Sequence, residues 1–377
     1  MDQGRMSGGT TARHTAFAAH SQHVITCLQF DDDKVVTGSD DTLIHVHDIK
    51  SGELRQELRG HESGVWCLQY EGNILVSGSA DRSVRVWDLN SGQWQHVLRG
   101  HAAAVRCLQI RMKEKPRTDT DPRDVEDATT IQHHPLIISG SRDGQVRVWR
   151  LPKNEDDDRH ENLEHHGLQD NPYFVRALCG HTETVRHLAG SGDMLASCSD
   201  DSTVRIWHVG TGELHHVLTG HSQRVSAIVV DDERNRIVSA SLDSRVKVWD
   251  LQTGSCVFTL QGHELPVRFL ALHREHLSSA DDTTIWTWNL ETGDRLQKLA
   301  IDARHVWGLQ LDATRTIWGG STAVHMQDRR TVESTCLISG LNSVWQVKSD
   351  EQRCVAAVQR GDETYVEIFS FDAAQGS

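Results

Sequence analysis

The stretch Val76-Ser77-Gly78-Ser79-Ala80-Asp81-Arg82-Ser83-Val84-Arg85-Val86-Trp87-Asp88 ends the clearest copy of a repeated unit. That copy begins at Gly60-His61 and continues through Val65-Trp66-Cys67-Leu68. Other copies end in Trp149-Arg150, Trp207-His208, Trp249-Asp250 and Trp288-Asn289, and a weaker one ends in His47-Asp48. A repeat of about forty residues, with apolar runs between turn residues, predicts four strands per copy.

Four polar or aromatic positions recur at fixed spacing within the copies. A Ser or Thr stands four residues before an Asp, and an aromatic residue or His follows the Asp by six residues. The sets are Thr37/Asp41/His47, Ser77/Asp81/Trp87, Ser139/Asp143/Trp149, Ser197/Asp201/Trp207, Ser239/Asp243/Trp249 and Ser278/Asp282/Trp288, with upstream His20, His61, His101, His181, His221 and His263. This pattern is typical of WD repeats, in which the four side chains form a hydrogen-bonded relay inside one propeller blade.

Ser, His and Asp also make up hydrolase triads. Their repetition in six equivalent registers instead predicts a structural role, so we predict no catalytic residue and no enzyme.

Six clear copies and two degenerate ones predict an all-β WD-repeat propeller, with eight blades favoured over seven. Val306-Trp307-Gly308-Leu309 and Val324-His325-Met326 indicate the seventh, and residues 344–347, 354–358 and 365–369 indicate three strands of the eighth. Residues 11–18 would complete that blade, since pairing the chain ends removes an open sheet edge. The propeller is therefore predicted over residues 11–372, between a flexible N-terminus at 1–10 and a tail at 373–377.

Composition excludes several functional classes. The net charge of −14 argues against nucleic-acid binding, because phosphate backbones repel an acidic chain. Much of the acid lies in insertions at about 112–134 and 153–171, which are predicted to be solvated loops with a linker or docking role.

The sequence shows no membrane span and no signal peptide. The histidines and the eight cysteines show no metal-ligand spacing, so no metal and no cofactor are predicted. Cys27, Cys67 and Cys107 occupy matching positions and are predicted to be buried residues of a reducing compartment.

At two positions of the repeat the fold demands no particular residue type, and several copies carry arginine there. The fifth residue after the repeat His opens the innermost strand, and the residue before the turn Asp lies at the same end of the blade. We call this end the upper end. In chain order the first position reads Ile25, Trp66, Arg106, Arg186, Ser226 and Arg268, and the second reads Asp40, Ala80, Arg142, Asp200, Leu242 and Asp281. Arg82 follows the turn Asp of the second copy.

Arg106, Arg142 and Arg186 are therefore expected at one mouth of the propeller. Clustered guanidinium groups repel one another unless an anion neutralises them, and they match phosphate oxygens in a bidentate way. Trp66 would add an apolar face, which suits a phosphorylated peptide with apolar or proline neighbours. A nucleotide phosphate is a weaker candidate, because no Gly-rich loop leads into a helix. The alternative is that each arginine pairs with a carboxylate such as Asp200, or stays solvated.

Several segments resemble the F-box/WD-repeat receptors of SCF ubiquitin ligases, especially the fungal ones. They are Val24-Ile25-Thr26-Cys27-Leu28-Gln29-Phe30, Gly64-Val65-Trp66, Ala104-Val105-Arg106-Cys107, Ser139-Gly140-Ser141-Arg142-Asp143, Leu151-Pro152-Lys153 and Asn171-Pro172-Tyr173-Phe174-Val175. The resemblance spans nearly the whole chain. It implies a phosphodegron-binding propeller of the nucleus and cytoplasm that captures phosphothreonine-proline peptides for ubiquitination. The phosphate-binding residues that it implies are Arg82, Arg106, Arg142 and Arg186, with Trp66 and Trp345 in an apolar pocket.

The chain also departs from this family. Asp200 and Ser226 stand where the family tends to carry tyrosines, and Ala80 and Ala104 replace hydroxyl residues. Asp200 is expected to compete for the arginines and to oppose a second negative charge, while Arg268 would compensate.

No F-box is expected in the short stretch before the first repeat, so the SCF adaptor would bind only if an F-box is supplied elsewhere. The alternative function is a phosphate-independent WD scaffold that assembles protein complexes through its rim and acidic loops.

Overall fold

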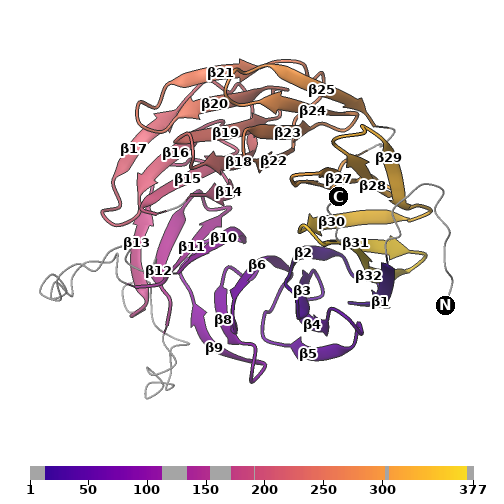
Figure 1. Ribbon diagram of the computed structural model, residues 1–377. Helices are drawn as coiled ribbons and strands as arrows, with labels where there is room; N and C mark the ends of the chain where they lie inside the picture. Colours follow the sequence, from indigo (N-terminus) through magenta and orange to yellow (C-terminus); the bar gives the residue numbers. More distant parts are fainter. Residues whose placement is uncertain (1–12, 113–133, 153–170, 191, 302–304, 372–377) are drawn as a thin grey trace, which may run out of the picture. The chain divides into compact units, whose positions relative to one another are not determined.

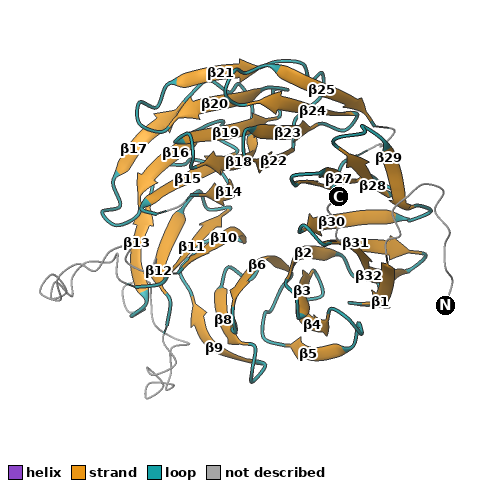
Figure 2. Ribbon diagram, viewed as in Figure 1, coloured by secondary structure: helices purple, strands orange, loops and turns teal. Residues whose placement is uncertain are grey.

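The computed structural model describes residues 13–112, 134–152, 171–190, 192–301 and 305–371. These residues form thirty-two strands in eight four-stranded antiparallel sheets, the blades of an all-β propeller (Figure 1). Figure 2 shows strands joined by loops throughout the described ranges, which contain no helix that could cross a membrane. The prediction of eight blades is confirmed. The predicted flexible N-terminus, the tail and most of both acidic insertions lie outside the described residues.

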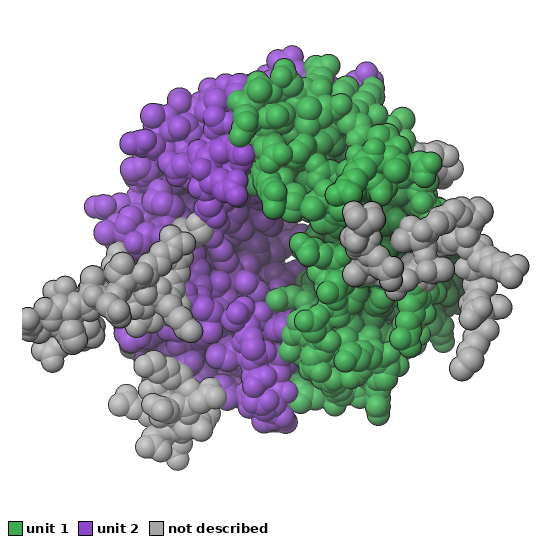
Figure 3. All heavy atoms as spheres, viewed as in Figure 1, with its two compact units in different colours: residues 1–59, 269–377 green, residues 60–268 purple. Residues whose placement is uncertain are grey.

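Residues 60–268 form one compact unit, unit 2, of four blades (Figure 3). Each blade is a meander in which consecutive strands pair, and the first strands of neighbouring blades pack on one another. Blade 2 has β6 (Val65–Glu71), β7 (Ile74–Ser79), β8 (Val84–Asp88) and β9 (Gln93–Leu98). Blade 3 has β10 (Val105–Arg111), β11 (Leu136–Ser141), β12 (Val146–Arg150) and β13 (Phe174–Leu178). Blade 4 has β14 (Val185–Ala189), β15 (Met194–Ser199), β16 (Val204–His208) and β17 (Leu214–Leu218). Blade 5 has β18 (Val225–Asp231), β19 (Arg236–Ser241), β20 (Val246–Asp250) and β21 (Cys256–Leu260).

The remaining blades belong to a second compact unit, unit 1, formed by residues 1–59 and 269–377. Blade 6 has β22 (Phe269–His273), β23 (His276–Ala280), β24 (Thr284–Asn289) and β25 (Arg295–Ala300). Blade 7 has β26 (Gly308–Leu311), β27 (Arg315–Gly319), β28 (Val324–Asp328) and β29 (Ser334–Ile338). Blade 8 has β30 (Ser343–Ser349), β31 (Arg353–Arg360), β32 (Glu363–Ser370) and β1 (Arg13–Ala18). Blade 1 has β2 (Ile25–Phe30), β3 (Lys34–Ser39), β4 (Ile44–Asp48) and β5 (Leu54–Leu58).

Blade 8 joins the two ends of the chain, as the sequence predicts. Strand β1 pairs antiparallel with β32 from Arg13 opposite Ser370 to Ala18 opposite Tyr365. The pairing covers the outer edge of β32, which would otherwise offer free backbone groups to another chain.

The predicted relay forms in blades 2 to 5. In blade 2, His61 Nδ1 lies 2.7 Å from Asp81 Oδ2, and His61 Nε2 lies 2.7 Å from Ser77 Oγ. The Trp87 indole donates to the same hydroxyl at 2.8 Å. The equivalent bonds in blades 3, 4 and 5 measure 2.8–2.9 Å. Ser77 is fully buried with its hydroxyl engaged by both neighbours, so the set holds a blade together rather than presenting a nucleophile.

Blade 1 forms two of the three hydrogen bonds of the relay. His20 lies 2.9 Å from both Asp41 Oδ2 and Thr37 Oγ1, as predicted. His47 replaces the tryptophan, and its buried Nδ1 has no hydrogen-bond partner within the described ranges. An imidazole at this position is too short to reproduce the indole.

In blade 6 the predicted relay is wrong at the serine. Trp288 donates to Ser279 Oγ at 2.8 Å, whereas the Ser278 hydroxyl lies 3.3 Å from that of Thr287. The turn between β23 and β24 is one residue shorter than its counterpart in blade 2, as the strand registers show. As a result Asp281, rather than Asp282, accepts the backbone N–H groups that close the turn.

We expect Asp81→Ala to lower the free energy of unfolding by about 2–4 kcal/mol, because it leaves the buried His61 Nδ1 and the Glu62 amide without their acceptor. Urea denaturation of the variant measures the loss. Glu62→Ala, which removes an exposed side chain from the same loop, should cost less than about 0.5 kcal/mol. Equal losses for the two variants would contradict a structural relay.

Blade 1 should be sensitive to acid. His45 stacks on His20 with ring centroids 3.8 Å apart, and His47 contacts Phe17 of β1 at 4.7 Å. Burial lowers the pKa of His45 and of His47 to about 4. The charge of His20 lowers both values further, whereas Asp41 and Glu57 partly oppose the shift at His45.

Both imidazoles are therefore neutral in the folded chain, whereas in the unfolded chain they take up protons near pH 6.5. Because the unfolded state binds more protons in this window, stability should fall as the pH drops from about 6.5 towards 4. Thermal unfolding at pH 7.5 and pH 5 measures the effect. His47→Trp, which restores the side chain of blades 2 to 5, should reduce it, and an unchanged pH dependence in that variant would contradict the assignment.

Candidate functional site

The upper end of unit 2 is formed by four bulged first strands. The pairing of the first with the second strand shifts register past one residue in each blade, and these residues are Trp66, Arg106, Arg186 and Ser226. The valine before each of them, namely Val65, Val105, Val185 or Val225, is fully buried. A bulge re-aims a side chain next to a fixed core position. Each blade therefore offers one residue that the core does not constrain.

In blade 1 the residue predicted for the upper position, Ile25, is wrong. Ile25 is fully buried and matches the core valines, and the register shift falls at Thr26. The loop after His20 is one residue longer than the others, so counting five residues from the histidine stops one residue short. Thr26, rather than Ile25, occupies the upper position of blade 1.

Arg106 of blade 3 lies against the tryptophan of blade 2. Its guanidinium carbon is 4.2 Å from the centroid of the Trp66 ring, within the range of a cation–π contact. Trp66 keeps 36 % of its surface exposed, and Arg106 is half-buried. Burial lowers the pKa of Arg106, and the positive charges of Arg186 and Arg142 lower it further. The arginines of blades 3 and 4 are therefore close enough to repel one another.

Arg142 and Arg82 lie on the turns of the same upper end. The Arg142 amide donates to the Ala104 carbonyl at 2.9 Å, which holds this turn against the start of β10. Arg82 has a φ of 71°, a left-handed conformation that is unfavourable for a residue with a side chain. Both side chains are exposed. In the described part of the chain, no carboxylate forms an ion pair with Arg82, Arg106 or Arg142.

Arg186 differs, because it is held by Asp200 of the same blade. Its Nε donates to Asp200 Oδ1 at 2.7 Å and its Nη2 donates to Asp200 Oδ2 at 2.8 Å. The hydrogen bonds to Asp200 raise the pKa of Arg186. The alternative of carboxylate pairing is therefore realised at Arg186, while the other three arginines lack such a partner among the described residues.

Blade 5 adds no charge at these two positions. The Ser226 hydroxyl donates to the carbonyls of Ala240, at 3.1 Å, and Val267, at 2.6 Å, so it is used within the fold. Leu242 occupies the turn position. Arg268 is exposed and precedes β22.

Unit 1 carries tryptophans at the equivalent position of two neighbouring blades. In blade 8, Trp345 lies at the register shift after the fully buried Val344. In blade 7, Trp307 follows the buried Val306 and keeps 43 % of its surface exposed. Counting from the repeat His identifies this position only through the sixth copy and therefore does not identify Trp307. A Val-Trp pair next to the start of the first strand is shared with Val65-Trp66 of blade 2 and Val344-Trp345 of blade 8, and it is the signal that identifies Trp307.

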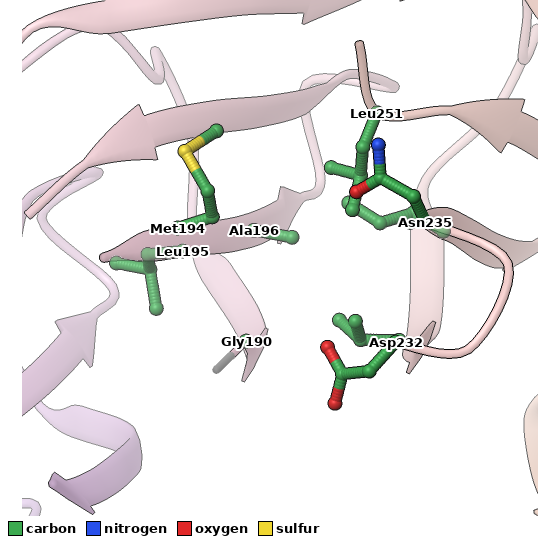
Figure 4. A pocket seen from close by; sticks show the side chains of 9 residues that line it. Gly190, Met194, Leu195, Ala196, Asp232, Asn235 and Leu251 are labelled. Carbon is green, nitrogen blue, oxygen red and sulfur yellow. The ribbon is translucent and has the colours of Figure 1, made fainter. Parts of the chain in front are cut away.

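Unit 2 also contains a small cavity between blades 4 and 5. Figure 4 shows Met194, Leu195 and Ala196 along one strand, facing Asp232 and Asn235. Its volume of about 90 Å³ is well below the roughly 300 Å³ of small-molecule sites. Within the described ranges no group of three His, Cys, Asp or Glu side chains could hold a metal ion, and all eight cysteines are free. The upper end of unit 2 is therefore the stronger candidate.

Comparisons with known proteins agree with the repeat pattern. The family model "WD domain, G-beta repeat" matches residues 11–48, 52–88, 120–150, 172–208, 212–250 and 254–289, more than half of the chain. Cell division control protein 4 of Candida albicans is 39 % identical over 94 % of this chain and 52 % of its own length. The WD repeat-containing protein pop2 of Schizosaccharomyces pombe is 38 % identical over 96 % of this chain and 51 % of its own length. The chain thus spans about half the length of the curated relatives it matches.

The F-box/WD repeat-containing protein sel-10 of Caenorhabditis elegans is 53 % identical over 47 residues, 12 % of this chain and 8 % of its own length. Among solved structures, the crystal structure of the computationally designed Ika8 protein matches with a TM-score of 0.73 and 26 % identity, covering 94 % of this chain and 98 % of that chain. The matched repeats and the eight blades confirm the predicted fold, and the chain belongs to the WD-repeat family.

Proposed function

We propose that this chain is the substrate-recognition propeller of an SCF-type ubiquitin ligase and that the upper end of unit 2 binds phosphothreonine-proline peptides. The observation that carries the proposal is the set of Arg82, Arg106 and Arg142, whose guanidinium groups lack a carboxylate partner in the described residues. In a chain with a net charge of −14, unpaired arginines beside one another favour an anionic ligand. The similarity to F-box/WD repeat proteins and to cell division control protein 4 supports the same function.

The geometry suits a phosphate with an apolar neighbour. Arg106 is held in place by the Trp66 ring, so less side-chain freedom is lost when it binds an anion. Its half-buried position strengthens a charge-assisted hydrogen bond relative to one made in water. Trp66 leaves part of its ring exposed beside these charges and can pack against a proline or an aliphatic side chain. Within unit 1, Trp345 and Trp307 are proposed as apolar contacts for a bound partner.

We further propose that the chain acts in the nucleus and cytoplasm, where its eight free cysteines fit a reducing compartment. Coupling to the ligase requires an F-box that binds the SCF adaptor.

A second candidate is a phosphate-independent scaffold that binds partners through the rim. It is favoured by exposed apolar side chains on last strands, such as Trp94 of β9 and Leu214 of β17, which are 44 % and 42 % exposed.

Fluorescence anisotropy with a Leu-Leu-phosphothreonine-Pro peptide and its unphosphorylated counterpart separates these functions. We expect binding of the phosphorylated peptide alone. Arg142→Ala should weaken it at least about 10-fold, because a hydrogen bond to a charged group contributes about 1.5–3 kcal/mol. The melting temperature should not change, since the Arg142 side chain is exposed and unpaired in the described structure.

Arg99→Ala, at an exposed arginine outside the set, is the matched control and should bind as the wild type does. Equal binding of both peptides, or binding of neither, would favour the scaffold. Unfolding of Arg142→Ala as severe as that of Asp81→Ala would make the arginine structural.

Arg82→Gly should separate binding from stability. Glycine is favourable at a φ of 71°, and Gly144 stands at the equivalent turn of blade 3 with a φ of 77°. We expect the free energy of unfolding to stay constant or rise by up to about 1 kcal/mol. Affinity for the phosphopeptide should fall about 3- to 10-fold, because one charge-assisted contact at an exposed position is lost.

Ser244→Gly makes the same backbone change in blade 5, where φ is 64°, and should leave the affinity unchanged. If Arg82→Gly stabilised the fold without weakening the peptide complex, Arg82 would not belong to the site.

A further inference from the structure

Blades 3 and 4 place different charges on the same backbone. In blade 3 the bulge residue is Arg106 and the turn residue is Arg142, and in blade 4 they are Arg186 and Asp200. The turn amide donates to the upper loop in both blades, at 2.9 Å for Arg142 and 3.0 Å for Asp200. Because the backbones of the two turns match, the two blades differ here in the charge of their side chains. Blade 3 presents two positive charges, whereas blade 4 neutralises its own.

The pair in blade 4 leaves part of the arginine free to donate. Asp200 engages the edge formed by Nε and Nη2, at 2.7 and 2.8 Å, and no hydrogen bond from Arg186 Nη1 to a described residue is formed. Arg186 keeps 35 % of its side-chain surface exposed, whereas Asp200 keeps 7 %. The carboxylate therefore lies beneath the guanidinium. Arg186 can still donate to an oxygen, but its positive charge is cancelled from below.

The positive charge of the upper end is consequently one-sided. Arg82, Arg106, Arg142 and Arg186 carry four positive charges, and Asp200 cancels one, which leaves +3 at the upper end of unit 2. The positive side lies on blades 2 and 3, where Arg82 and Arg142 are exposed. Towards blade 5 the next two positions are Ser226, whose hydroxyl is engaged, and Leu242.

A phosphate dianion bound on the side of blades 2 and 3 neutralises two of these three charges. We infer that Asp200 is a specificity-determining residue that restricts this site to peptides carrying a single phosphate. The inference rests on the proposed phosphopeptide function. One bound phosphate neutralises most of the positive charge, and a second phosphate near blade 4 meets Arg186, whose charge Asp200 already cancels from below. Specificity of this kind comes from a repulsive group that opposes the wrong ligand.

The test compares the gain from a second phosphate in two proteins. The peptides are a singly phosphorylated phosphothreonine-proline peptide and a series in which a second phosphoserine is placed two to five residues away on either side. Anisotropy gives Kd for each peptide with the wild type and with Asp200→Asn, which keeps an oxygen acceptor for Arg186 at nearly the same volume.

We expect the second phosphate to improve Kd by less than about 3-fold in the wild type at every position. In Asp200→Asn the improvement should reach at least about 10-fold at one position or more, because a repulsive unit charge has been removed. The difference between the proteins should shrink at 0.5 M salt, where exposed charges are screened. A purely structural role of Asp200 would shift all peptides alike and would not change this ratio.

Glu183→Gln is the matched control, since it neutralises an exposed carboxylate in the upper loop of the same blade without touching the ion pair. It should behave as the wild type does. Asp200→Ser provides a second neutral variant if Asp200→Asn folds poorly, as judged by its melting temperature.

Two results would overturn the inference. If the second phosphate brings the same gain in the wild type and in the neutral variants, Asp200 does not select, although binding of the singly phosphorylated peptide would still support the proposed function. If neither protein distinguishes phosphorylated from unphosphorylated peptides at any position, the proposed function fails, and the inference fails with it.

Discussion

The hydrogen bond between the repeat histidine and the turn aspartate is the interaction on which the rest of the structure depends. In blade 2 it joins the loop before β6 to the turn between β7 and β8, and Ser77 and Trp87 extend it across the sheet. Each buried polar atom in this relay has a partner, so removing one member leaves another unsatisfied. The relay thereby fixes the first three strands of the blade with respect to one another.

Because the relay fixes the blade, two positions next to it can vary in residue type. Once the aspartate holds the turn, the residue before it and the residue at the bulge of the first strand contribute nothing to the relay. Ala80, Arg142, Asp200 and Leu242 occupy the first of these positions in unit 2 with the same backbone bond to the upper loop. The fold therefore tolerates a cation, an anion or an apolar residue there, and the identity of these residues is available for recognition.

The sequence predicts the regular blades well and the irregular ones less well, for local reasons. Counting from His20 stops at Ile25, because the longer loop of blade 1 shifts the bulge to Thr26. Counting back from Trp288 stops at Ser278, because the turn of blade 6 is shorter by one residue. A one-residue change in a loop moves every later position by one. Fixed spacings taken from the clear copies do not detect such a change in loop length, whereas burial and strand pairing in the structure show it.

Charge pairing sets a second limit on prediction from sequence. The clustering of Arg106, Arg142 and Arg186 follows from the repeat register, but the sequence leaves open which of them pairs with a carboxylate. The structure shows that Asp200 pairs with Arg186, through two hydrogen bonds within blade 4. The rigid backbone holds the two residues within hydrogen-bonding distance of each other, so only their side chains are ordered when the pair forms. The regular backbone that makes the fold predictable from its repeats also places Asp200 beside Arg186. As a result, the unpaired positive charge of the upper end of unit 2 ends at blade 4.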